Sequence, residues 1–540
     1  MTSVPSPSHR RTEIRGSIAL STMQLLRDAS ITRKLTVNVG VRWDYDTPTT
    51  ERFNRASRGF AFGTASPVEA QARTNYAANP IPEVPASQFR VQGGLLFAGL
   101  NGAPRGLFAP DRNNFSPRVG FAYAWRPRTV LRAGYGLFFE PLGSDRLDAA
   151  QPGFNQRTVM APSLDNGLSF AATLANPYPN GLLEPVGAAA GLNTFIGQSI
   201  SITNPDRRNA YAQRWSFNLQ QELPRRFLLD VGYMGNRAVG LATSPDVNAV
   251  PAQYLSRSAV RDNNTNAFLT AQVRNPFAGI AAFNGSGLQG ANVARQQLLR
   301  PYPQFGSIST VWNNGYAWYH SLQARVERRL ANGFTVQGSY TWSKNMEAVD
   351  YLNASDTAPS RVVSPLDQTH VWAMSGVYEL PFGKQSGRWT KLAIGGWSLQ
   401  GLWQAQSGRP LAWGNVLFNG DLKNITLGRG DRDADRWFNT AAGFERNAAL
   451  QLVSNLRTFP FRLNGVRAPG VNLTNLSVSK NFAITERWRL QFRAEAVDAF
   501  NATLLSAPNT TPTSGQLGQI TTIGNGNTQR RVTLGGKLIW

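Results

Sequence analysis

The sequence has 540 residues, of which 41% are hydrophobic and only 16% are charged, whereas about 25% of the residues in soluble domains are charged. The net charge is +23, but the Arg residues are spread along the chain and form no basic tract, so nucleic-acid binding is not expected. Cysteine is absent, and the three histidines (His9, His320 and His370) are scattered. Disulfides, thiol catalysis and His/Cys metal clusters are therefore excluded.

Residues 1–15 are polar and basic, and they contain neither the apolar stretch nor the cleavage pattern of a signal peptide. We expect them to form a polar tail in front of one large β domain over residues 16–540. No run approaches the roughly 18 apolar residues of a transmembrane helix. A membrane location would therefore require a closed β-barrel, because open sheet edges cannot be satisfied in lipid.

Apolar and polar residues alternate with a period of two in many segments, which is the pattern of a strand with one apolar and one polar face. The segments that predict strands are 16–26, 35–45, 118–125, 131–140, 214–220, 229–233, 322–327, 334–343, 372–380, 397–403, 476–482, 488–496 and 530–540. The first two strands are expected to be joined through residues 27–34.

The connections between these strands alternate between short turns, such as the one at Asn332 and Gly333, and long polar stretches. This alternation is typical of outer-membrane barrels. The chain is therefore predicted to be all-β, an antiparallel up-and-down transmembrane β-barrel with about thirteen strands of a larger barrel. The aromatic residues expected to point outward are Trp125, Tyr135, Phe217, Trp342, Trp397, Trp403, Trp488 and Phe492, and the polar residues expected on the concave side include Gln337 and Gln400.

Five charged residues on the polar faces of the strands are predicted to line the lumen: Arg118, Arg132, Arg489, Arg493 and Glu495. Their simplest role is to face water and to pair across neighbouring strands. The alternative role is contact with a solute or with a domain inside the barrel.

The last strand has apolar residues at alternate positions, Val532, Leu534 and Leu538, and it ends on Trp540. A terminal amphipathic strand that closes on an aromatic residue is similar to the assembly signal of bacterial outer-membrane barrels. An ordinary edge strand of a soluble sheet is the alternative for this segment taken alone.

Few residues suggest catalysis or cofactor binding. Gly285, Gly287 and Gly290 match the G-x-G-x-x-G pattern, but no clear strand precedes them and no acidic residue follows within about 20 residues, as a dinucleotide site requires. A flexible loop is expected there. A glycan-cleaving enzyme would need a pair of carboxylates in a cleft, and no such pair can be identified. We therefore expect neither enzymatic activity nor a cofactor.

Asp431, Asp433 and Asp435 form the one weak metal candidate, because alternating carboxylates can bind Ca²⁺. The segment lacks the Gly of a calcium-binding loop, and arginines are interleaved with the aspartates. A solvated loop neutralised by its own arginines is the preferred interpretation, so no metal is expected.

Several longer segments resemble one family. They are ITRKLTVNVGVRWDYDTPTTERFNR (31–55), NNFSPRVGFAYAW (113–125), LRPYPQFGSIS (299–309), YHSLQARVERRLANGFTVQGSYTWSK (319–344), GNVLFNGD (414–421), DRWFNT (435–440) and LQFRAEAVDAFN (490–501). Together they resemble the barrel of a TonB-dependent outer-membrane receptor of the Oar-like type abundant in Acidobacteria. The resemblance implies location in the outer membrane of a Gram-negative bacterium and TonB-energised uptake of a bulky nutrient.

The resemblance also implies partners: outer-membrane lipid, the barrel-assembly machinery, an extracellular ligand that the sequence does not identify, and the TonB complex through a plug domain. Such receptors carry a signal peptide, often a carboxypeptidase-regulatory-like domain, and the plug before the barrel, and none is recognisable here. They have about 22 strands. The chain is therefore expected to be the C-terminal part of a receptor. The alternative is a surface-exposed barrel or adhesin whose loops bind glycan or a partner protein without transport.

Overall fold

The computed structural model describes residues 21–540 except 141–150, 156, 164, 166, 384–386, 486 and 525–528, and for 21–30, 388 and 391 it describes the backbone alone. Its main element is one sheet of 14 strands, thirteen of which pair in chain order, while β15 (Val362–Val363) pairs with β14 only. The thirteen are β1 (Ser21–Thr32), β2 (Leu35–Tyr45), β5 (Asn114–Arg126), β6 (Thr129–Phe139), β8 (Tyr211–Leu223), β9 (Phe227–Thr243), β13 (Trp312–Ala331), β14 (Phe334–Ala348), β16 (His370–Glu379), β17 (Trp397–Gln406), β20 (Val471–Ala483), β21 (Arg489–Val497) and β22 (Arg531–Ile539).

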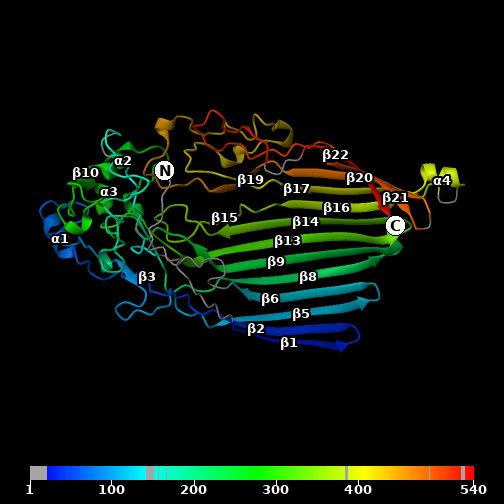
Figure 1. Ribbon diagram of the computed structural model, residues 1–540, viewed down its shortest axis with the longest axis horizontal. Helices are drawn as coiled ribbons and strands as arrows, with labels where there is room; N and C mark the ends of the chain where they lie inside the picture. Colours follow the sequence, from blue (N-terminus) through cyan, green and yellow to red (C-terminus); the bar gives the residue numbers. More distant parts are fainter. Residues whose placement is uncertain are drawn as a thin grey trace.

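Every neighbouring pair in this series is antiparallel, which confirms the all-β up-and-down prediction. Figure 1 shows the strands side by side, with the long connections gathered at one end and the short turns at the other. Within the described part of the chain, β1 and β22 are the two edges, and the sheet does not close between them.

Two connections differ from the sequence prediction. The first hairpin turns at residues 33–34, so β1 runs to Thr32 and the link expected over 27–34 is wrong. Residues 21–26 of the strand expected over 16–26 lie in β1, whereas residues 16–20 and the tail expected over 1–15 lie outside the described residues. The charged Arg27 and Asp28 interrupt the apolar alternation, but pairing with the full length of β2 keeps them in a strand. The β16–β17 connection, residues 380–396, lies where the alternation of short and long connections predicts a short turn, but it contains helix α4 (Arg388–Ile394).

The remaining elements lie in the long connections. The helices there are α1 (Glu69–Ala77), α2 (Asn263–Thr270) and α3 (Arg295–Leu298). The small strand pairs are β3 (Ser57–Phe60) with β4 (Leu95–Phe97), β7 (Ile200–Ile202) with β12 (Ile308–Thr310), β10 (Gln272–Arg274) with β11 (Asn292–Ala294), and β18 (Pro410–Ala412) with β19 (Arg462–Arg467). Among the described residues, no helix has the length and apolar character needed to cross a bilayer.

The hydrophobic core lies in these connections and not on the sheet. One cluster, here called the first loop module, joins residues 60–97, 196–202 and 247–308, with Phe89, Phe277 and Phe305 fully buried. A second cluster, the second loop module, joins residues 411–468 with Leu517 around Trp413. Of the thirteen strands, only Ala348 supplies a buried hydrophobic side chain in the described part of the chain.

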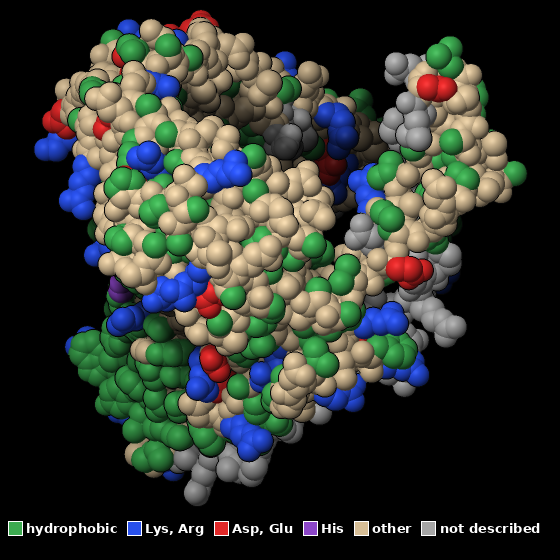
Figure 2. Space-filling view, turned by 90° about the vertical axis from the view of Figure 1, so that its left-hand side faces the viewer, with side chains coloured by type: hydrophobic (Ala, Val, Ile, Leu, Met, Phe, Trp, Pro, Cys, Tyr) green, Lys and Arg blue, Asp and Glu red, His purple; other side chains and the backbone are tan. Residues whose placement is uncertain are grey.

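The apolar face of the sheet, called the outer face here, therefore has no packing partner within the described chain. Trp125 and Trp342 are 51% and 54% exposed, whereas Trp397 and Trp403 are half-buried. Figure 2 shows hydrophobic side chains gathered on the flank below the loops. A broad exposed apolar face suits contact with lipid and not with water. The opposite face, called the inner face, carries the polar residues.

Candidate functional site

The inner face contains a cavity of about 490 Å³ that extends over five strands from β14 to β21. Its lining includes the predicted inner residues Gln337 and Gln400, together with Arg493 and Glu495. The Arg493 guanidinium lies 2.5 Å from a Glu495 carboxylate oxygen and donates through Nε to the Ser477 hydroxyl at 3.2 Å. Arg493 and Glu495 thus pair within β21, and Arg493 also contacts β20 through Ser477, while their role in lining the lumen stays a prediction.

A second cavity of about 410 Å³ lies on the inner face over the strands from β5 to β13. Arg118 and Arg214 line it, and their guanidinium carbons lie 4.7 Å and 5.3 Å from the centre of the Phe138 ring. Met234 and Asn236 of β9 also line it. The sequence prediction included Arg118 but not Arg214. Arg214 could have been identified from the sequence, because it alternates with Ser216 on the polar face of the same predicted strand.

The other two predicted lumen residues, Arg132 and Arg489, lie outside both cavities. Arg132 donates to the Gln220 side chain across β6 and β8 at 2.7 Å. Arg489 begins β21, is exposed and lies opposite Ile539 of β22.

The predicted assembly residues lie on the last strand. Val532, Leu534 and Leu538 alternate on the outer face of β22, opposite apolar positions of β21. The ring of Trp540 lies 6.0 Å from that of Trp488. The two aromatic residues thus form a pair at the turn end of the sheet, and their role in assembly remains a prediction.

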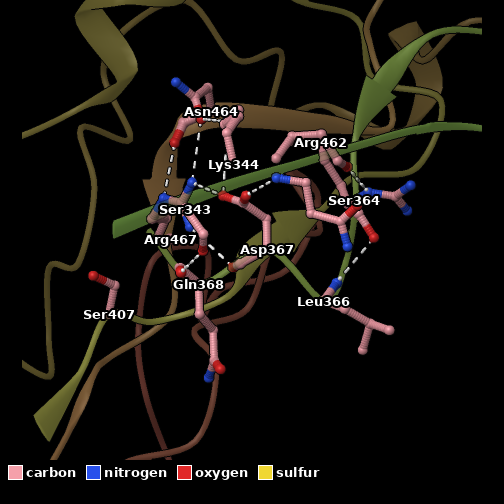
Figure 3. Close-up of polar contacts among 12 residues, drawn as sticks. Ser343, Lys344, Ser364, Leu366, Asp367, Gln368, Ser407, Arg462, Asn464 and Arg467 are labelled. Carbon is pink, nitrogen blue, oxygen red and sulfur yellow. Dashed lines mark hydrogen bonds and ion pairs between the residues drawn. The ribbon is translucent and has the colours of Figure 1, made fainter. Parts of the chain in front are cut away.

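A buried ion cluster joins the loop end of β14 to two connections, residues 349–369 and 407–470 (Figure 3). The Asp367 carboxylate is fully buried and lies 2.5 Å from Arg467 Nη2 and 3.7 Å from Lys344 Nζ. It also accepts the backbone N–H of Asn345 at 2.5 Å. The Lys344 ammonium donates as well to the side chain of Asn464. A buried carboxylate loses its contacts with water, so charged and hydrogen-bonding partners of this kind are needed to stabilise its ionised form.

A second ion pair continues the cluster. Arg462 donates to Glu347 at 2.7 Å and to the Val363 carbonyl at 2.7 Å, while the Ser364 hydroxyl donates to the other Glu347 oxygen. The cluster therefore fastens β19 of the second loop module to β14 of the sheet. Arg462 and Arg467 lie about one hundred residues from their carboxylate partners in sequence, so no local pattern could have predicted these two pairs.

The two loop modules also touch each other. Ser256 of the first module donates its backbone N–H to the carbonyl of Ser454 in the second, at 2.9 Å. Beside this contact, Asp262 caps helix α2 by accepting the backbone N–H of Thr265 at 2.9 Å. This bond, with those from the Thr265 and Ser256 hydroxyls, lowers the pKa of Asp262 to about 2. The loops are therefore held in a defined arrangement.

The two remaining sequence motifs have structural roles. Asp433 accepts the backbone N–H groups of Asp435 and Arg436 at 3.0 Å and 2.7 Å. In the described part of the chain, Asp431, Asp433 and Asp435 form no metal-binding group, nor do any other three His, Asp or Glu residues. The segment from Gly285 to Gly290 is a loop, as expected, and its Ser286 and Leu288 are buried in the first loop module.

The family model described as outer membrane beta barrel domain matches residues 28–533. The chain therefore belongs to the outer membrane beta-barrel domain family, and its location is the outer membrane of a Gram-negative bacterium. No curated protein matches the sequence significantly.

Solved outer-membrane proteins are similar to this chain at low identity. They include the ferric-catecholate import receptor Fiu from E. coli K12 (9% identity, 96% of this chain and 44% of that chain, TM-score 0.40). The transporter YddB from Escherichia coli gives 9% identity, 96% and 53% coverage and a TM-score of 0.40. The ferripyoverdine receptor of Pseudomonas aeruginosa gives 11% identity, 96% and 38% coverage and a TM-score of 0.38. The chain thus spans between 38% and 53% of the length of these three structures.

Proposed function

We propose that this chain forms the wall and the external loops of a receptor-type transporter of the outer membrane, of the TonB-dependent kind that its sequence segments resemble. The observation that carries the proposal is the division of the sheet into an apolar outer face and a polar inner face with two cavities. A wall of this kind can separate lipid from a polar path for a solute.

The long connections supply the recognition surface in this proposal. They emerge at one end of the sheet, and two hydrophobic clusters and the Asp367 cluster hold them in place. Binding residues are commonly placed on loops that a rigid scaffold positions. The external end of the molecule would thus meet a bulky nutrient before it reaches the inner face.

Energy coupling and closure of the wall belong to the same proposal. A plug-type domain on the inner face would connect the wall to the TonB complex, as in the receptors that the sequence resembles. The free edges of β1 and β22 would pair with further strands, because unpaired backbone groups are not tolerated in lipid.

The test is uptake by bacteria with and without the intact gene, grown on a panel of iron chelates, oligosaccharides and peptides. We expect the deletion to abolish growth on one class of compound, and a protonophore to stop its uptake in the wild type. Equal uptake of every compound by the two strains, with the protein present in the outer membrane, would contradict transport.

A surface-binding protein without transport is the second candidate. The observation in its favour is that the loops form modules with hydrophobic cores of their own. Purified outer membranes with and without the protein should then differ in binding to polysaccharide or to a partner protein, while uptake stays the same.

A further inference from the structure

Two arginines of the inner face lie in one row across four strands. The antiparallel registers place Arg118 of β5 opposite Gly136 of β6, Gly136 opposite Arg214 of β8, and Arg214 opposite Asn236 of β9. Side chains at directly opposed positions project from the same face of a sheet. Both guanidiniums and the Asn236 amide therefore meet in the cavity of about 410 Å³.

Glycine keeps the centre of this row open. A Cβ at Gly136 would lie 2.9 Å from Phe138 Cε2 and 3.5 Å from Arg118 Cγ. Without it, the Phe138 ring lies close to both guanidiniums. An aromatic ring attracts a guanidinium through its face and leaves the N–H groups of the cation free to donate.

These two arginines lack the partners that other inner-face arginines have. In the described part of the chain, no carboxylate forms an ion pair with Arg118 or Arg214. The Arg118 Nε and the Asn236 Oδ1 are buried, and no hydrogen-bond partner for either lies among the described residues. By contrast, Arg493 pairs with Glu495, and Arg132 donates to Gln220.

We propose that the Arg118–Arg214 row is a binding subsite for an organic carboxylate, with the carboxylate between the guanidiniums and the carbon skeleton against Phe138 and Met234. Arginine matches a carboxylate in geometry as well as in charge. The apolar side chains in the same cavity favour an anion with a hydrophobic body over a small inorganic one. The subsite rests on the proposed function in one respect, that the inner face lines the path of the solute.

Binding to the full chain refolded in detergent micelles tests the proposal without any transport step. The probe is 2-naphthoate, followed by its fluorescence, and the neutral 2-naphthylmethanol is its matched control. We expect naphthoate to bind more tightly than the alcohol, and the combined R118Q and R214Q substitutions to weaken naphthoate about tenfold or more while leaving the alcohol unchanged. Gly136→Leu should also weaken naphthoate, because its side chain would enter the cavity.

Arg132→Gln is the control substitution, since it removes the same charge from the same face, four residues along β6 and roughly 13 Å from Gly136. It should leave naphthoate binding unchanged. Far-ultraviolet circular dichroism and heat-modifiable migration establish that each variant is folded.

Three results would overturn the proposal: no binding of naphthoate by the folded wild type, equal binding by the double variant, or equal weakening by R132Q. Displacement of naphthoate by an acidic peptide but not by benzoate would also overturn it, because the site would then receive a polypeptide. A failure of energy-dependent uptake with naphthoate binding retained would contradict the proposed transport and not this subsite.

Discussion

At the scale of single residues, Asp367 is the group on which the stability of the packed loops should depend most. Its carboxylate has no exposure and joins Arg467 and Lys344. Asp367→Ala should destabilise the packed loops by about 3 kcal/mol, because two cations lose their buried counter-ion. Limited proteolysis of the loops as a function of urea measures the effect. The control is Arg325→Gln, which removes an exposed ion pair with Glu327 and should change stability by less than about 0.5 kcal/mol.

Asp262 gives a pH-dependent prediction at the same scale. The folded structure lowers the pKa of this carboxyl to about 2, whereas an unfolded Asp titrates near about 3.9. The stability that the ionised Asp262 gives to the folded state is therefore complete above about pH 4 and is lost as the pH falls towards 2. Hydrogen exchange of α2 should accelerate over that interval in the wild type. In Asp262→Asn, which has no carboxyl group to protonate, this acceleration should be absent. The same pH profile in both proteins would show that Asp262 is not the group responsible.

At the scale of elements, the β13–β14 turn shows how local conformation sets the register of a hairpin. Asn332 and Gly333 have φ values of 53° and 75°, as the Asn-Gly pair predicted. A Cβ at Gly333 would lie 3.0 Å from the Glu379 backbone oxygen. Gly333→Ala should therefore lower the free energy of unfolding by about 1–2 kcal/mol, measured by urea unfolding in micelles.

Gly338 of β14 is the matched control for this turn substitution. Its Cβ position has no neighbour within 4 Å, so Gly338→Ala should be neutral or slightly stabilising. Equal losses from the two alanine substitutions would show that the turn conformation is not the cause.

The last strand is the second element with a clear expectation. Leu538 and Trp540 follow the apolar alternation of β22. Replacing both by Asp should leave most of the protein outside the membrane, because carboxylates on a lipid-facing strand oppose insertion. Heat-modifiable protein in the outer-membrane fraction is the measurement. Lys537→Asp, on the inner face of the same strand, should insert normally; equal loss in both variants would point to a general folding defect.

At the scale of the whole molecule, the open sheet decides the expected behaviour of this chain. Among the described residues, β1 and β22 have neighbouring strands on one side only, and open edges are not tolerated in lipid. In the inserted protein both edges should therefore be paired, so hydrogen exchange at the backbone N–H groups of β1 and β22 should be as slow as in the central strands. Fast exchange confined to β1 and β22 in outer-membrane fractions would show that the edges stay open.

The sequence by itself determined the strands and their order. Period-two alternation identified the sheet strands because a strand with lipid on one side and a polar lumen on the other must alternate along its whole length. Asn332 and Gly333 were predicted to form a turn because they lie between two segments with this alternation. The prediction from alternation was wrong where charged residues interrupt the pattern, as in β1. There, pairing with the neighbouring strand keeps the charged residues in a β-strand whatever their side chains.

Only the tertiary structure decided how distant residues meet. The loop modules, the Asp367 cluster and the row of Arg118 and Arg214 join residues that lie tens to hundreds of positions apart. A linear pattern shows on which face of a strand an arginine lies, but not which side chain on another strand faces it. Register supplies that information, and it separates the paired Arg132 and Arg493 from the open site that Arg118 and Arg214 form.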